Sequence, residues 1–149
     1  MQIETTRFGA LPIDENHVIT FPEGLPGFEG CRQFTFIPHP TPEGADTSPF
    51  EWLQSVEDGS LAFLAMNPQV AFPHYTPRLP RTEMETLSLE QDRDEDTRVY
   101  TLLTVPKGDP EGITANLLAP VVVNAGARLG KQVVLTSDEY GLRHRLIPN

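Results

Sequence analysis

The chain has 149 residues, of which 21 are Asp or Glu and 11 are Lys or Arg, so its formal net charge is −10. Direct binding to nucleic acid or to anionic membranes is disfavoured, because both depend on an excess of Lys and Arg. Apolar residues make up 38% of the sequence, enough for one hydrophobic core at this length, and we expect a single domain over residues 1–149.

Short strands are the predicted elements along most of the chain. Fifteen prolines and eleven glycines interrupt it too often for long helices. Segments rich in Val, Ile, Thr and Phe lie between these breaks and are typical of β-strands. The predicted strands cover residues 2–7, 17–21, 33–37, 52–56, 61–66, 99–105, 115–124 and 131–136. Phe34 and Phe36 should share one face. Many short strands predict an all-β fold, either a sandwich or a barrel.

One short helix is predicted near residues 82–89. Thr82 and Glu85 have the spacing of a capping box, in which each side chain bonds the other residue's backbone N–H. Met84 and Leu87 would then lie on one face of the helix, three residues apart.

Two segments are predicted to be exposed loops. Residues 38–49 contain four prolines, which remove N–H donors and favour polyproline-like backbone. Residues 91–96 are too charged to be buried, and an acidic docking patch is the alternative there.

Motifs for catalysis, nucleotide binding or metal binding do not occur in this sequence. It has no glycine-rich phosphate loop, no His-Glu-x-x-His and no Gly-x-Ser-x-Gly. None of the histidines has another histidine or a cysteine at a spacing typical of metal ligands. The histidines are His17, His39, His74 and His144. The single cysteine, Cys31, has acidic neighbours that disfavour a reactive thiolate. No signal peptide or membrane-spanning run is visible. We expect a cytoplasmic binding protein with no cofactor and no metal.

Charge is distributed unevenly along the chain. Residues 1–111 hold 19 acidic and 7 basic side chains, a net charge of −12, whereas residues 112–149 hold 2 acidic and 4 basic ones, a net charge of +2. The acidic part forms either a solvated surface or a face for a basic partner.

Four segments are more specific than strand composition requires. They read Phe-Pro-Glu-Gly-Leu-Pro-Gly-Phe at 21–28, Phe-Glu-Trp-Leu-Gln-Ser-Val-Glu-Asp at 50–58, Thr-Ala-Asn-Leu-Leu-Ala-Pro-Val-Val-Val-Asn at 114–124, and Gly-Lys-Gln-Val-Val-Leu at 130–135. In this order and spacing they resemble the FliW family of flagellar assembly factors. The resemblance runs over residues 3–144, nearly the whole chain.

The resemblance implies a small cytoplasmic antiparallel β-barrel without enzymatic activity. It also implies two protein partners: flagellin before its export, and CsrA, an RNA-binding translational regulator. Flagellin that accumulates would occupy the protein and leave CsrA to repress flagellin mRNA translation, and export would reverse this. The protein would thus be both a flagellin chaperone and a CsrA antagonist. An acidic surface suits such a role, because it attracts a basic regulator and repels RNA.

Two alternatives come from other functional classes. A small β-barrel ligand-binding module or flavin-type enzyme could hold a cleft that the sequence does not reveal. A nucleic-acid-binding barrel would need a basic groove with exposed aromatic residues, and the charge of −12 over residues 1–111 opposes it.

Six residues are candidates for contact with a protein partner. Trp52, the only tryptophan, is either an interface anchor or part of the core. Gln54 and Ser55 are polar groups in an otherwise apolar strand. Asn116 is a lone amide in an apolar run and either bonds backbone groups at a bulge or contacts a partner. Pro120 cannot donate to a β-ladder, which indicates an edge or bulge where an extended partner segment could pair. The candidates are Trp52, Gln54, Ser55, Asn116, Leu117 and Pro120.

Overall fold

The computed structural model describes residues 1–38, 49–89, 95–109, 112–136 and 139–146. The strands are β1 (Gln2–Thr5), β2 (Gly9–Pro12), β3 (Ile19–Thr20), β4 (Gln33–Pro38), β5 (Phe50–Ser55), β6 (Ala62–Met66), β7 (Thr97–Thr104), β8 (Thr114–Ala115), β9 (Val121–Asn124), β10 (Leu129–Gln132) and β11 (His144–Arg145). The helical elements are η1 (Glu15–His17), η3 (Pro68–Val70) and α1 (Arg81–Thr86).

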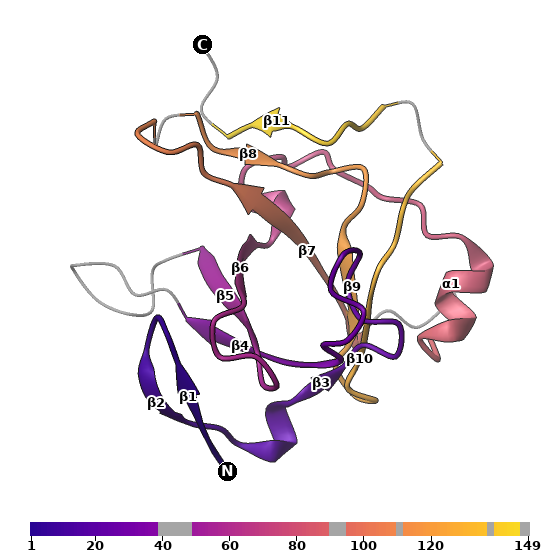
Figure 1. The fold of residues 1–149 in the computed structure, drawn as a ribbon. Helices are drawn as coiled ribbons and strands as arrows, with labels where there is room; N and C mark the ends of the chain where they lie inside the picture. The colour runs from indigo at the N-terminus through magenta and orange to yellow at the C-terminus, as the bar shows by residue number, and fades with distance from the viewer. Residues whose placement is uncertain (39–48, 90–94, 110–111, 137–138, 147–149) are drawn as a thin grey trace.

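Seven of these strands close a barrel (Figure 1). Their order is β7-β6-β5-β4-β3-β10-β9, and β9 pairs in turn with β7. All neighbouring pairs are antiparallel except β3 and β10, which run parallel. The all-β barrel expected from the sequence is therefore confirmed, with one parallel pair added.

Smaller layers lie outside the barrel. The β1–β2 hairpin at the N-terminus packs on the turn between β5 and β6, where the Thr6 amide donates to the Gly59 carbonyl at 3.0 Å. A Cβ on Gly59 would collide with the Glu4 carbonyl, so this close approach of two backbones requires glycine. At the other end, β8 and β11 extend the sheet from β7.

The core has apolar side chains on both faces of β9. Val121 and Val123 point into the barrel, where they join a buried cluster with Phe21, Phe34 and Leu53. Val122 points outward and packs under α1, in the cluster that also holds Leu87, Leu89, Val133 and Leu135. A strand buried on both faces reads as a continuous apolar run, which explains the three consecutive valines.

The helix α1 lies where it was expected, but its capping differs from the prediction. It begins at Arg81, and its N-cap residue, Pro80, offers no side-chain hydrogen bond. The predicted capping box of Thr82 and Glu85 is therefore wrong, and Glu85 instead pairs with Arg81 at 3.4 Å. Leu87 is buried and Met84 packs beside it, so the shared face is confirmed.

The predicted strands differ from the structure in several places. The predicted strand 131–136 extends past β10, which ends at Gln132. Residues 115–124 do not form one strand but are divided into β8 and β9 by an irregular stretch, the bulged segment (residues 116–120). Strand β2 was missed because Gly9 and Pro12 occupy its ends, and β11 because it has only two residues. Most of the two predicted loops, residues 39–48 and 90–94, lies outside the described residues.

Candidate partner-binding site

Trp52 is half-buried on β5, beneath the tip of the N-terminal hairpin. The Arg7 guanidinium lies over the indole ring, 4.0 Å from its centroid, and Phe8 meets the ring edge-on at 6.4 Å. The cation–π contact and the aromatic pair cover part of the ring. The rest of the indole ring is accessible, and Trp52 stays a predicted contact for a partner.

Gln54 and Ser55 are fully buried and organise the turn over residues 56–61. The Ser55 hydroxyl accepts the amides of Glu57 at 3.2 Å and Asp58 at 3.0 Å. The Gln54 amide nitrogen donates to the carbonyls of Ser55 at 2.9 Å and Leu61 at 3.2 Å. Their polarity thus has a use inside the protein, and direct contact with a partner would require this turn to open.

The bulged segment carries the other three candidates. The Asn116 side-chain oxygen accepts the Ala119 amide at 3.0 Å, the intramolecular use expected for a lone amide beside a bulge. Leu117 is buried, and its carbonyl accepts the Tyr75 hydroxyl at 2.7 Å. Pro120 is buried as well, and only Asn116 is partly exposed.

The carbonyls of the bulged segment bond to the strand beside it. The Leu135 amide donates to the Leu118 carbonyl at 2.8 Å, and the Val133 amide donates to the Pro120 carbonyl at 2.9 Å. The Gln132 side chain donates to the Ala119 carbonyl at 2.9 Å. The edge that Pro120 suggested is therefore occupied by the chain itself, and an extended partner segment has no free place there.

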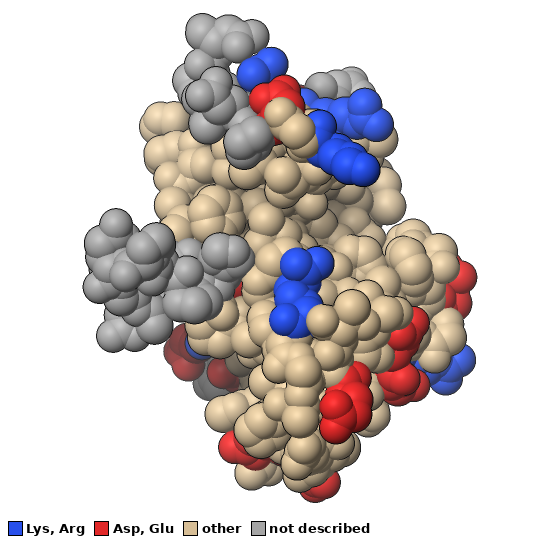
Figure 2. Space-filling view, turned by 60° about the vertical axis from the view of Figure 1, so that its left-hand side comes forward, with Lys and Arg blue, Asp and Glu red and all other residues tan. Residues whose placement is uncertain are grey.

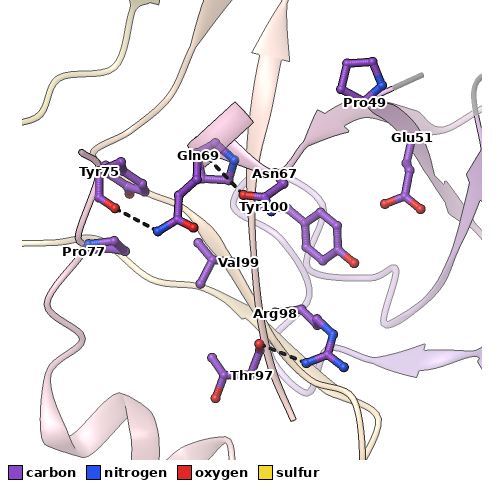
Figure 3. Close-up of a pocket in the computed structure, with 11 residues that line it drawn as sticks. Pro49, Glu51, Asn67, Gln69, Tyr75, Pro77, Thr97, Arg98, Val99 and Tyr100 are labelled. Atoms are coloured by element: carbon purple, nitrogen blue, oxygen red, sulfur yellow. Dashed lines mark hydrogen bonds between the residues drawn. The ribbon is translucent and has the colours of Figure 1, made fainter. Parts of the chain in front are cut away.

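A cleft opens where β6 and β7 separate. These strands pair only through Ala65 with Leu102 and Met66 with Thr101, after which the chain leaves the sheet at Asn67 and enters η3. The space that this leaves between β7, η3 and the start of β5 has a volume of about 460 Å³ (Figure 3). It is lined by Pro49, Glu51, Asn67, Pro68, Gln69, Tyr75, Pro77, Thr97, Arg98, Val99 and Tyr100.

Glu51 and Tyr100 give this cleft its electrostatic character. Glu51 projects from β5 into the cleft (Figure 3), and burial raises the pKa of its carboxyl group. Burial also raises the pKa of Tyr100, and the nearby Glu51 charge adds to that effect while Arg98 opposes it. Among the described residues, no Lys, Arg or His pairs with the Glu51 carboxylate. Within those residues the cleft therefore holds an acidic group that forms no ion pair, although the Arg98 guanidinium lines the same cleft.

Sequence reasoning did not single out the cleft residues. Glu51 alternates with Leu53, which lies in the barrel interior, so a strand period of two places the carboxylate on the inward face. That pattern was visible in the sequence. The separation of β6 from β7 was not, because it depends on how distant strands pair.

Groups suited to a metal ion are not found in the described ranges: no three of His, Cys, Asp and Glu come together there. Within the same ranges, no helix is long and apolar enough to cross a membrane. Cys31 is a free thiol, half-buried against the interior cluster.

A family model described as FliW protein matches residues 2–146. The chain belongs to the FliW family of flagellar assembly factors. FliW proteins are non-enzymatic assembly factors, so this chain is an assembly factor and not a flavin-type enzyme.

Individual FliW proteins are similar over their full length. The flagellar assembly factor FliW of Magnetococcus marinus is 41% identical over 149 residues, covering 100% of this chain and 86% of that protein. The one from Alkaliphilus metalliredigens is 40% identical over 147 residues, covering 99% and 86%. A crystal structure of the flagellar assembly factor FliW superposes with a TM-score of 0.87 at 36% identity, covering 100% of this chain and 99% of the other.

Proposed function

We propose that this FliW protein acts in the cytoplasm as one domain that binds flagellin and CsrA in alternation. Flagellin bound to it leaves CsrA on the flagellin mRNA, and export of flagellin lets it remove CsrA and restore translation. The observation that carries this proposal is the match to the FliW family over residues 2–146. Exchange of the two partners makes flagellin synthesis respond to flagellin export.

The charge of the protein supports CsrA as a partner. The net charge is −10, and in the face drawn in Figure 2 acidic side chains are concentrated in the lower half, while the largest group of basic ones lies at the upper end. An RNA-binding regulator carries a basic surface, which an acidic face attracts over a distance. The same face repels RNA, so the protein itself is expected to leave nucleic acid unbound.

Trp52 and Asn116 are the partly exposed members of the six candidate residues and are proposed as direct contacts. Contacts of this kind set the lifetime of a complex, whereas exposed charges steer its formation. Raising the salt concentration should therefore slow association with CsrA more than it changes dissociation. Asn116→Ala should do the reverse. Biosensor kinetics at several salt concentrations measure both rates, and a salt-insensitive association rate would contradict the electrostatic part.

A gel-shift assay tests the function itself. CsrA is first bound to a flagellin leader RNA, and this protein is then added in increasing amounts. The RNA should be released, and addition of purified flagellin should restore the CsrA–RNA band. The control lane holds this protein with RNA alone and should show no shift. If the CsrA–RNA band is unaffected at large excess, the proposed function is wrong.

A further inference from the structure

In the part of the chain that the structure describes, one edge of β7 is unpaired from Thr97 to Tyr100. The Asn116 amide donates to the Leu102 carbonyl, and the Ala125 amide donates to the Asp96 carbonyl. Even-numbered residues of β7 therefore direct their backbone groups toward β8 and β9, and odd-numbered residues direct theirs to the opposite side. On that opposite side β6 pairs with Thr101 but not with Val99 or Thr97.

The backbone groups of Val99 thus face the cleft. Val99 lines it, and Gln69 lies across it on η3, where its amide bonds the Tyr75 carbonyl at 3.2 Å (Figure 3). The Thr97 carbonyl faces the same way, but the Arg98 guanidinium donates to it at 3.2 Å and to the Glu95 carbonyl at 2.6 Å. Within the described residues nothing bonds the Val99 amide and carbonyl or the Thr97 amide, and these groups form the edge available to another strand.

Glu51 supplies charge in the same cleft. It pairs with Ala65 of β6 shortly before the chain leaves the sheet at Asn67, and its half-buried carboxylate points into the cleft from β5 (Figure 3). Transferring a carboxylate to a partly buried position without a counter-ion costs free energy. An incoming cationic side chain would recover part of that cost, whereas an acidic one would be repelled.

We propose that the cleft between β7 and η3 is a docking site for an extended segment of a protein partner, which adds as a short strand to the edge at Val99 and places a Lys or Arg side chain against Glu51. Strand addition gives affinity through backbone hydrogen bonds, and the side-chain pocket gives selectivity. This inference depends on the proposed function only in assuming that the chain binds proteins. It adds what kind of segment the cleft recognises: an extended one with a basic side chain.

Titration of the isotope-labelled full-length protein with a short peptide tests the site by NMR. The probe is acetyl-Thr-Val-Lys-Val-Thr-amide, compared with the same peptide carrying Glu in place of Lys and with an N-methylated version whose backbone can no longer donate hydrogen bonds. We expect the Lys peptide to shift the Val99 amide signal, the Glu peptide to bind at least about fivefold more weakly, and the N-methylated peptide to bind more weakly than its parent.

Two protein variants distinguish the effect of Glu51 in the cleft from the effect of the protein's overall negative charge. Glu51→Gln should weaken binding of the Lys peptide about fivefold. Glu15→Gln removes the same charge from an exposed position on η1 and should leave binding unchanged. The inference is overturned if no peptide shifts Val99, if the N-methylated peptide binds as well as its parent, or if both variants behave alike.

Hydrogen exchange with the proposed partners distinguishes this inference from the proposed function. Binding of CsrA or flagellin should slow exchange of the Val99 amide. If either protein binds and Val99 stays unprotected, the docking site is wrong and the proposed function stands. If neither protein binds while the Lys peptide does, the proposed function is wrong and the site stands.

Discussion

The two edges of β7 differ in how completely the chain uses them. On the closed edge, β8, the bulged segment and β9 follow β7 from Thr104 to Thr97 and bond to it almost throughout. On the open edge, β6 pairs at two residues and then leaves, so that Val99 faces a cleft. The backbone of β7 is therefore hydrogen-bonded along one edge and only partly paired along the other.

An irregular sequence marks a bulge here and not a binding edge. Asn116 and Pro120 interrupt an apolar run and indicated either an edge or a bulge, and the structure has the bulge, whose backbone is held by hydrogen bonds within the chain. The open edge carries an ordinary strand sequence around Val99. What makes it available is the departure of β6 at Asn67.

The largest expected effect is a loss of stability on the closed edge. Leu117→Ala removes a side chain that is 2% exposed and should lower the free energy of unfolding by about 3 kcal/mol, because it leaves a cavity in the bulged segment. Thr97→Ala, on the open edge, should cost less than about 1 kcal/mol. Urea unfolding measures both, and equal losses would contradict the distinction between the edges.

Tyr75→Phe tests the hydrogen bonding of the closed edge. The buried Tyr75 hydroxyl donates to the Leu117 carbonyl at 2.7 Å, and burial raises the pKa of this hydroxyl, so it remains a donor at neutral pH. Its removal leaves a buried carbonyl unbonded and should cost about 1–2 kcal/mol in urea unfolding. Tyr140→Phe is the control, because the Tyr140 hydroxyl accepts the more exposed Thr76 amide at 3.2 Å, and its loss should cost less.

Lys131→Gln tests the layer that covers the closed edge. The Lys131 ammonium bonds Glu83 of α1 at 2.8 Å and Glu23 at 2.9 Å, with the lysine side chain 21% exposed. The variant should lose about 1 kcal/mol at neutral pH. Arg81→Gln, which breaks an exposed pair with Glu85, should lose less than about 0.5 kcal/mol.

The effect of Lys131 should also depend on pH. Hydrogen bonds to Glu83 and then Glu23 raise the pKa of Lys131 above its ordinary value of 10.5. A raised lysine pKa gives stability that is complete below 10.5 and is lost as the pH rises through the raised value. The difference between the wild type and Lys131→Gln should therefore be constant from about pH 8 to about pH 10 and shrink above that. A difference that grows in alkali would contradict this.

The smallest expected effect on stability is at the open edge. Arg98→Ala removes an exposed guanidinium that bonds the Thr97 carbonyl, and should change the free energy of unfolding by less than about 0.5 kcal/mol. The same change makes that carbonyl available and removes a positive charge beside the cleft. Binding of the Lys peptide should therefore become tighter in the NMR titration, and weaker binding would mean that Arg98 itself contacts the peptide.

Local patterns in the sequence predicted most strands, but not how they meet. Period-two alternation placed Phe34 and Phe36 on one face, and the apolar run ending in Val123 marked the most buried strand. Gln54 and Ser55 were recognised as unusual because they are polar in an apolar strand. Whether such groups serve a turn or a partner depends on which backbone groups fold back over them, and that is set by tertiary structure.

The parallel pairing of β3 with β10 affects when this protein can fold during its synthesis on the ribosome. It joins Thr20 to Leu129, so the barrel cannot close until the chain has been translated past Leu129. Until then Phe21 and Phe34 lack the valines of β9 that cover them. Pairings between residues so distant in sequence form slowly and leave apolar surface exposed meanwhile. The nascent chain should therefore remain an open sheet until β9 and β10 have been synthesised, and these two strands should decide when it becomes competent to bind.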